Sequence, residues 1–341
     1  MDWLRSLGPV ADTSVVVVVD GGGTQSRAAV GTSDGELLAY AEGGPTNQRS
    51  AGDDDAAANL RDVIAAAVAD AGAPEVGSVL VSSASVDTQA HVDVLSAGVA
   101  EALPSAGDVL VMADTIGCWA ATASLEPAVA LIAGTGSAVL AGSLEHGSRR
   151  FGGWDYVLGD EGSGFALGRD ALREVLLVSE GRSDATILAD ACRARLGIEE
   201  TDELFDRIYK PEIDKSVIAS FARDVLDLAT KGDPCSTAIV DDQQRRLAET
   251  VAAAFRAYPS IHTLGCFGGL WNVELYRTRF IRAVMTALGH RPTIVYPGDT
   301  AMAGSFRLLH RLGPDGAAGD AEDAAVARFT EALAAAKDAA G

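Results

Sequence analysis

The stretch VVVVVDGGGTQS, residues 15–26, decides the fold of this chain. Its run of valines predicts a strand buried on both faces, because such strands read as continuous apolar segments. The strand ends at Asp20 and leads into Gly-Gly-Gly-Thr. Glycines there let backbone N–H groups approach an anion, Asp20 can hold a hydrated Mg²⁺, and Thr24 can donate its hydroxyl to a phosphate. Taken alone, a plain strand followed by a glycine turn is the simpler interpretation.

The residues after the glycines exclude two common nucleotide sites. Residues 26–43, SRAAVGTSDGELLAYAEG, predict a strand, a Ser-Asp-Gly turn and a second strand. A dinucleotide site or a P-loop would begin a helix here, and no Gly-Lys-Ser/Thr follows the glycines. The predicted unit is therefore strand, phosphate turn, strand.

The same unit recurs at residues 129–142, VALIAGTGSAVLAG, with a Gly-Thr-Gly-Ser turn between two apolar strands. The two turns begin at Gly21 and Gly134, a separation on the scale of a domain. Two such hairpins predict an α/β protein of duplicated architecture, with a nucleotide clamped between its halves.

Composition narrows the class of protein further. The chain has 341 residues, enough for two domains, and a formal net charge of −21, which argues against binding to nucleic acid or an anionic membrane. ATP is not excluded, because backbone N–H groups and Mg²⁺ supply local positive charge. No apolar run is long enough for a membrane span and no signal peptide is recognised, so we expect a cytosolic protein. The 4 cysteines form no CxxC pair, so we expect reduced thiols.

Asp114 is the candidate for chemistry. It ends the predicted strand VLVMAD, residues 109–114, and precedes a predicted helix over residues 115–124. Ligands in open α/β sheets sit at the carboxyl ends of strands, where a carboxylate can accept the proton of an attacking hydroxyl. The alternative is that Asp114 only caps the helix.

Three further segments have both a functional and a structural interpretation. In residues 151–172, Asp160 and Glu161 could hold sugar hydroxyls or a metal-bound water, or could favour a helix N-terminus. Asn47 could face a substrate or stabilise a turn. Gly268 and Gly269 could admit an adenosine, or could simply separate a strand from a helix. The tail from residue 313 predicts a loose linker and a marginal Ala-rich helix over residues 324–339.

With these residues in hand, the chain resembles the N-acetylglucosamine kinase group of the actin-like ATPases, within the BadF/BadG-type ATPase family. That family also holds activators of benzoyl-CoA reductase and 2-hydroxyacyl-CoA dehydratase. The matching motifs occur in family order: DGGGTQS from Asp20, GGPTN from Gly43, MAD ending at Asp114, AGTGS from Ala133, GGWDYVLGDEGSGFALGR from Gly152 and FGGLWN from Phe267.

The resemblance implies two ribonuclease-H-like domains with ATP in the cleft between them, and γ-phosphoryl transfer to a sugar hydroxyl, usually O6 of a hexosamine. We expect one domain from residues 1–115 plus about 298–315, a second from residues 116–297, and a loose or helical tail over residues 316–341. A homodimer is also implied. The resemblance assigns Asp20 to water-mediated Mg²⁺ binding, Asp114 as the general base, Gly21, Gly22, Gly23, Thr24, Gly134, Thr135, Gly136, Ser137, Gly268 and Gly269 to ATP, and Asn47, Asp87, Gly152, Gly153 and Asp160 to the sugar.

The chain departs from the family at three positions. Asp155 stands where Gly-Gly-Trp is usually followed by glycine, Ser85 stands where glycine is usual, and Gln25 stands where lysine is common. An added carboxylate at Asp155 could favour an amine-bearing sugar or could point away. These departures leave open which amino sugar or cyclitol is phosphorylated.

Two other functions compete with the kinase. An ATPase activator that transfers electrons through an iron–sulfur cluster would carry cysteine beside the second glycine turn, where this chain has Ala133. A non-catalytic sugar or nucleotide sensor should lack the base or one of the loops, and every motif is present. Both arguments favour the kinase.

Overall fold

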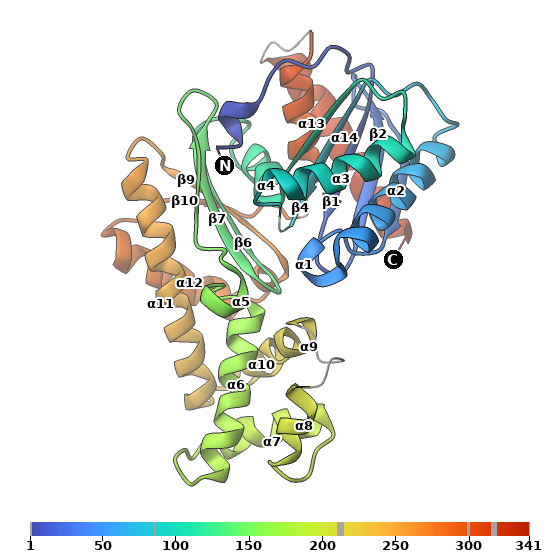
Figure 1. Cartoon of the computed structure of the whole chain (residues 1–341). Helices are drawn as coiled ribbons and strands as arrows, with labels where there is room; N and C mark the ends of the chain where they lie inside the picture. Colours follow the sequence, from blue (N-terminus) through green and yellow to red (C-terminus); the bar gives the residue numbers. More distant parts are fainter. Residues whose placement is uncertain (1, 85, 210–214, 299–300, 315–318, 341) are drawn as a thin grey trace. The chain divides into compact units, whose positions relative to one another are not determined.

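The computed structural model describes residues 2–84, 86–209, 215–298, 301–314 and 319–340 (Figure 1). The chain forms two compact units. Unit 1 comprises Met1–Ala130, Gly142–Arg149 and Asp299–Gly341, and unit 2 comprises Leu131–Ala141 and Arg150–Gly298.

Unit 1 contains a five-stranded sheet in the order β3-β2-β1-β4-β5. Its strands are β1 (Val15–Gly21), β2 (Ser26–Thr32), β3 (Leu37–Gly43), β4 (Ser78–Ser83) and β5 (Asp108–Ala113). β2 runs antiparallel to β1 and β3, whereas β4 is parallel to β1 and β5. Val17, Val18 and Val19 of β1 are fully buried, as the valine run predicts. This is the ribonuclease-H-like arrangement.

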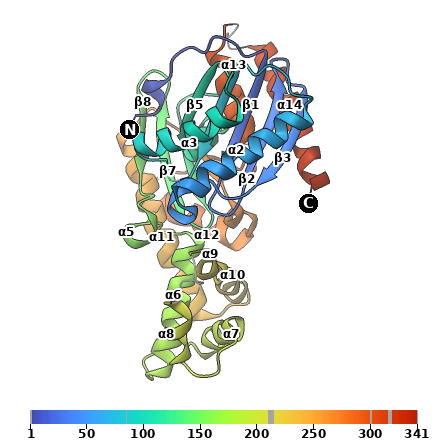
Figure 2. The same cartoon turned by 45° about the vertical axis from the view of Figure 1, so that its right-hand side comes forward.

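Helices cover both faces of this sheet (Figures 1 and 2). α2 (Asp53–Asp70) and α3 (Gln89–Ala102) lie on one face, with the short α1 (Gln48–Ala51) at the start of α2. α4 (Asp114–Thr122), α13 (Ala301–Leu312) and α14 (Asp320–Ala340) lie on the other. A single 3₁₀ turn, η1 (Leu4–Ser6), precedes β1.

α14 is more firmly packed than its Ala-rich sequence predicts. The ring of Phe329 is buried and stacks on that of Phe306 in α13, with centroids 4.4 Å apart. Glu322, also buried, pairs with Arg307 and Arg311 of α13 at 2.7 Å each. Stacking and paired charges therefore fix α14 on unit 1.

The second sheet has the order β10-β9-β6-β7-β8. Its strands are β6 (Ala128–Ala133), β7 (Ser137–Ser143), β8 (Gly147–Phe151), β9 (Thr263–Phe267) and β10 (Thr293–Val295). β6, the first strand of this sheet in sequence, lies at its centre, with β7 and β8 on one side and β9 and β10 on the other. The first sheet has the same arrangement around β1. The predicted α/β duplication is confirmed.

Unit 2 is otherwise helical. Its elements are α5 (Asp155–Leu158), α6 (Gly164–Ser179), α7 (Thr186–Leu196), α8 (Glu203–Ile208), α9 (Lys215–Ser220), α10 (Ala222–Thr230), α11 (Pro234–Ala257), the 3₁₀ turn η2 (Gly269–Asn272) and α12 (Glu274–Leu288). The side chain of Ser163 caps α6, and that of Asp233 caps α11, where Pro234 occupies the first helical position. Among the described helices, none combines the length and apolar character needed to cross a bilayer.

Candidate active site

The glycine turn between β6 and β7 presents two backbone N–H groups on one side. The N–H groups of Gly164 and Phe165, at the start of α6, donate to the carbonyl oxygens of Gly134 and Thr135 at 2.8 and 3.1 Å. In a planar trans peptide the N–H group points opposite to the carbonyl. The N–H groups of Thr135 and Gly136 therefore point away from α6, as a phosphate-binding turn requires.

Gly268 brings the third glycine motif against this turn. Its φ is +101°, and a Cβ at this position would collide with the carbonyl oxygen of Ala133. Only glycine fits so close an approach in this conformation. A Cβ on the neighbouring Gly269 would meet no described atom within 4 Å. The predicted adenosine motif and the predicted phosphate motif of unit 2 thus adjoin.

Asp160 lies beside Gly136 of the same turn. A Cβ on Gly136 would lie 2.8 Å from Oδ2 of Asp160 and 3.0 Å from Nζ of Lys215. The Lys215 ammonium is 2.5 Å from Oδ2 of Asp160 and 2.5 Å from Oδ1 of Asp155. Burial raises the pKa of Asp160, and the hydrogen bond from Lys215 partly offsets this. Burial lowers the pKa of Lys215, but its two carboxylate partners outweigh burial and leave it raised.

Residues 152–162 adopt an unusual backbone. Gly152, Gly153, Asp155 and Asp160 have φ values of +61°, +65°, +65° and +64°. A Cβ on Gly153 would lie 2.9 Å from that of Ala138 in β7, so glycine is needed there for space as well as for conformation. The left-handed conformation at residue 155 favours glycine, and aspartate tolerates it better than most other residues.

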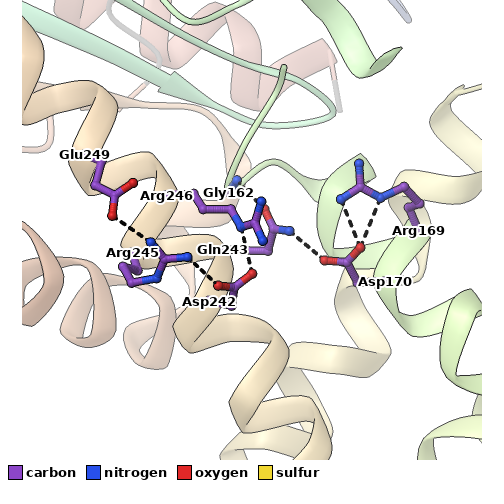
Figure 3. Close-up of polar contacts among 8 residues, drawn as sticks. All are labelled: Gly162, Arg169, Asp170, Asp242, Gln243, Arg245, Arg246 and Glu249. Atoms are coloured by element: carbon purple, nitrogen blue, oxygen red, sulfur yellow. Dashed lines mark hydrogen bonds and ion pairs between the residues drawn. The ribbon is translucent and has the colours of Figure 1, made fainter. Parts of the chain in front are cut away.

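The loop that carries Asp160 is held by buried side chains from two other helices. Oε1 of Gln243 in α11 accepts from the N–H of Gly162 at 2.9 Å, and Oη of Tyr276 in α12 donates to the carbonyl of Gly162 at 2.6 Å. Nε2 of Gln243 donates to Asp170 at 2.6 Å, and Arg169 also contacts Asp170 (Figure 3). Both backbone polar groups of Gly162 are therefore hydrogen-bonded to side chains.

In unit 1, the first glycine turn is closed by its own backbone. The N–H of Gly22 donates to the carbonyl of Gln25 at 2.9 Å, and the carbonyl of Gly22 accepts from Thr46 and Asn47 at 3.2 and 3.3 Å. The N–H of Gly23 consequently points away from the 46–47 loop. Gly23 and Thr24 are exposed, so these groups are available to a ligand.

Asp114 is the first residue of α4, directly after β5, while the N-cap position belongs to Ala113. Asp114 thus occupies the first turn of α4, one residue after the N-cap position. Burial raises the pKa of the Cys118 thiol, and the carboxylates of Asp114 and Asp20 raise it further. Burial likewise raises the pKa of Asp20, against the charge of Arg27, whose nearest nitrogen is 3.7 Å away.

The two predicted sugar contacts of unit 1 already have protein partners. The side chain of Asn47 caps α1 by accepting from the N–H of Arg49 at 2.9 Å, as the turn interpretation predicts. The guanidinium of Arg49 is 2.5 Å from Asp87. Arg49 was not predicted, because neither its type nor its spacing marks it before the fold brings it to Asp87. Ser85 lies outside the described residues.

Asp20 is the predicted contact for Mg²⁺ in unit 1. In the described part of the chain, no group of three or more His, Cys, Asp or Glu side chains is arranged to hold a metal. Mg²⁺ usually keeps several waters and takes one or two carboxylates together with substrate phosphates. Asp20, beside the first glycine turn, is a suitable residue for that role.

Two sheets of the same strand order, each with a glycine turn after its central strand, define an α/β protein of the duplicated, actin-like ATPase class. The chain belongs to the BadF/BadG/BcrA/BcrD ATPase family, whose model matches residues 17–305. It is 28% identical over 240 residues to an N-acetylmuramic acid/N-acetylglucosamine kinase of Clostridium acetobutylicum, which covers 70% of this chain and 78% of that protein. It is 26% identical over 253 residues to an N-acetyl-D-glucosamine kinase of Dictyostelium discoideum, covering 71% and 79%.

Solved structures agree on the fold. A Chromobacterium violaceum protein, provisionally named an N-acetylglucosamine kinase, superposes with a TM-score of 0.69 at 23% identity, covering 87% of this chain and 99% of that one. At this identity, the likeness establishes the shared fold.

Proposed function

We propose that this protein is an ATP-dependent kinase that transfers the γ-phosphoryl group to a hydroxyl, O6 in the first instance, of an amino sugar such as N-acetylglucosamine or glucosamine. The observation that carries the proposal is the position of Asp114, which starts α4 directly at the carboxyl end of β5. The named activities of the two similar kinases support the choice of acceptor.

Asp114 is the general base of the proposed reaction. Its carboxylate orients the acceptor hydroxyl and accepts its proton as the hydroxyl oxygen bonds to the γ-phosphorus and ADP departs. Because phosphoryl transfer has a loose transition state, positioning and charge neutralisation supply most of the rate. Asp160, together with Asn47, Asp87, Gly152 and Gly153, is assigned to the acceptor.

The two glycine turns are assigned to the nucleotide. In unit 2, this assignment is supported by the N–H groups of Thr135 and Gly136. They point away from α6, because the carbonyl groups of the same two peptides accept hydrogen bonds from the start of α6. Gly23 and Thr24 serve the same role in unit 1, and Gly268 with Gly269 serves the adenosine. When bound, Mg²⁺·ATP supplies the transferred group and part of the charge neutralisation, and Asp20 holds the ion through water. A cytosolic homodimer completes the proposal, on the resemblance alone.

The test is ADP release with Mg²⁺·ATP against N-acetylglucosamine, glucosamine, N-acetylmuramic acid and glucose. We expect turnover on at least one amino sugar, reduced about 100- to 10,000-fold in Asp114→Asn, as for loss of a general base. Asp93→Asn, an exposed change on α3, is the matched control. Turnover that survives Asp114→Asn contradicts the role of the base. Sugar-independent hydrolysis, or no activity, contradicts the kinase and favours an activator or a sensor.

A further inference from the structure

Lys215 contacts three side chains of the candidate site. Its ammonium contacts Asp155 and Asp160 at 2.5 Å each, and it lies 5.7 Å from the ring centre of Tyr156. The Asp160 side chain is 4% exposed and that of Lys215 is 28% exposed. A buried carboxylate needs such a partner, because an unpaired charge there would be costly.

The position of Lys215 depends on two glycines of α6. A Cβ on Gly168 would collide with the carbonyl of Ile218 in α9, and a Cβ on Gly164 would lie 3.3 Å from the carbonyl of Ala219. These glycines sit four residues apart on one face of α6, so the backbone of α9 can lie directly on it. α9 begins at Lys215, and this close crossing sets the lysine against the 134–137 turn.

The charges of the cluster explain how the chain accommodates Asp155. Asp155 adds one negative charge beside Asp160, because both carboxylates contact the same ammonium group. Lys215 adds one positive charge and contacts both carboxylates. The three side chains together carry the same net charge as Asp160 alone. Asp155 is thereby engaged by Lys215, and an acceptor meets no additional unpaired carboxylate from it.

We propose that Lys215, held by Asp155, is a positioning residue that fixes the Asp160 carboxylate against the Gly136 turn for contact with the acceptor hydroxyls. This inference rests on the proposed kinase function. It assigns the departure at Asp155 to the support of Asp160 and not to selection of an amine-bearing sugar.

Steady-state kinetics on the preferred sugar test the proposal with Lys215→Met, Lys215→Arg and Asp155→Gly. Loss of a charged hydrogen-bond partner should raise the acceptor KM about 10- to 100-fold in Lys215→Met, with the ATP KM changed less than about twofold. Lys215→Arg should restore most of the loss. Lys231→Met, an exposed change after α10, is the matched control. In Asp155→Gly, the ratio of turnover with glucosamine to that with N-acetylglucosamine should stay within about twofold.

Several results would overturn the proposal. A rise confined to the ATP KM would assign Lys215 to the nucleotide, and a glucosamine preference lost in Asp155→Gly would assign Asp155 to an amine. Should the wild type phosphorylate no sugar, the kinase proposal fails by itself. Thermal unfolding then tests the Lys215–Asp160 ion pair separately. The double variant Lys215→Met/Asp160→Asn should lower Tm by less than the sum of the two single changes. Additive Tm shifts would contradict the coupling of the two side chains.

Discussion

Gly162 donates its backbone N–H to Oε1 of Gln243, a buried side chain on α11, at 2.9 Å. The two residues are 81 positions apart in sequence, so this hydrogen bond connects the loop that carries Asp160 to α11, a helix distant in the sequence. The contact fixes the peptide group before Gly162, and the hydroxyl of Tyr276 fixes the peptide group after it by donating to the Gly162 carbonyl. The position of Asp160 thus depends on residues that need not touch any substrate.

Replacing Gln243 by leucine should therefore damage both stability and acceptor binding. The change leaves the buried N–H of Gly162 without its acceptor, which costs about 1–3 kcal/mol, and it removes one donor from Asp170, whose Oδ1 keeps its contacts with Arg169. Urea unfolding should show a loss of roughly 1–3 kcal/mol. Arg245→Leu, on the same helix but with exposed ion pairs, should cost less than about 1 kcal/mol. Equal losses in the two variants would contradict the assigned role of Gln243.

The pair Gly268 and Gly269 allows backbone strain to be separated from ligand contact. Gly268→Ala should lower Tm by several degrees, because the new Cβ meets the Ala133 carbonyl at a φ of +101°. Gly269→Ala should leave Tm nearly unchanged, because no described atom lies within 4 Å of its new Cβ. If adenosine packs there, Gly269→Ala should raise the ATP KM about tenfold without changing the acceptor KM. An unchanged ATP KM in Gly269→Ala would exclude adenosine from this turn.

The elements with strong local signals were predicted from the sequence. The valine run, the two glycine turns and the apolar segments that flank them fixed β1, β2, β6 and β7, because strand and turn preferences act over a few neighbouring residues. The packing of α14 was not foreseen. Its alanines gave a weak helix signal, and the stacking of Phe329 on Phe306 depends on a contact that no local pattern encodes.

The site divides in the same way. Asp114 and the glycine motifs could be proposed from the sequence, because each lies on a short stretch of residues with recognisable chemistry. Lys215 was missed, because nothing near it in sequence relates it to Asp155 and Asp160. That relation arises only when Gly164 and Gly168 let α9 lie on α6. Periodicity and residue spacing do not predict contacts between side chains that are brought together by a close helix crossing.

Phe329 should be a major source of stability for unit 1. Its buried ring contacts Phe306, and truncating a buried phenylalanine to alanine costs about 3–5 kcal/mol. We expect Phe329→Ala to lose about that much free energy of unfolding, and Glu331→Ala, an exposed change on the same helix, to lose almost none. Equal stability of the two variants would show that α14 is not docked as described.

The buried thiols predict a loss of stability at alkaline pH. Burial raises the pKa of Cys192 to about 12, with Asp224 adding to the shift. The folded state therefore holds a proton that the unfolded chain releases above its ordinary thiol pKa of about 8.5. The stabilisation is complete below that pH and is lost progressively up to about pH 12, by at most about 4–5 kcal/mol at about 1.4 kcal/mol per pKa unit.

Cys192→Ala should have a lower Tm than the wild type at pH 7 and a shallower decline of Tm between pH 8.5 and 11. Cys235, whose pKa is raised to about 11 by burial, supplies the comparison, and Cys235→Ala should flatten the curve less. Parallel Tm curves for the wild type and Cys192→Ala would contradict proton retention by Cys192.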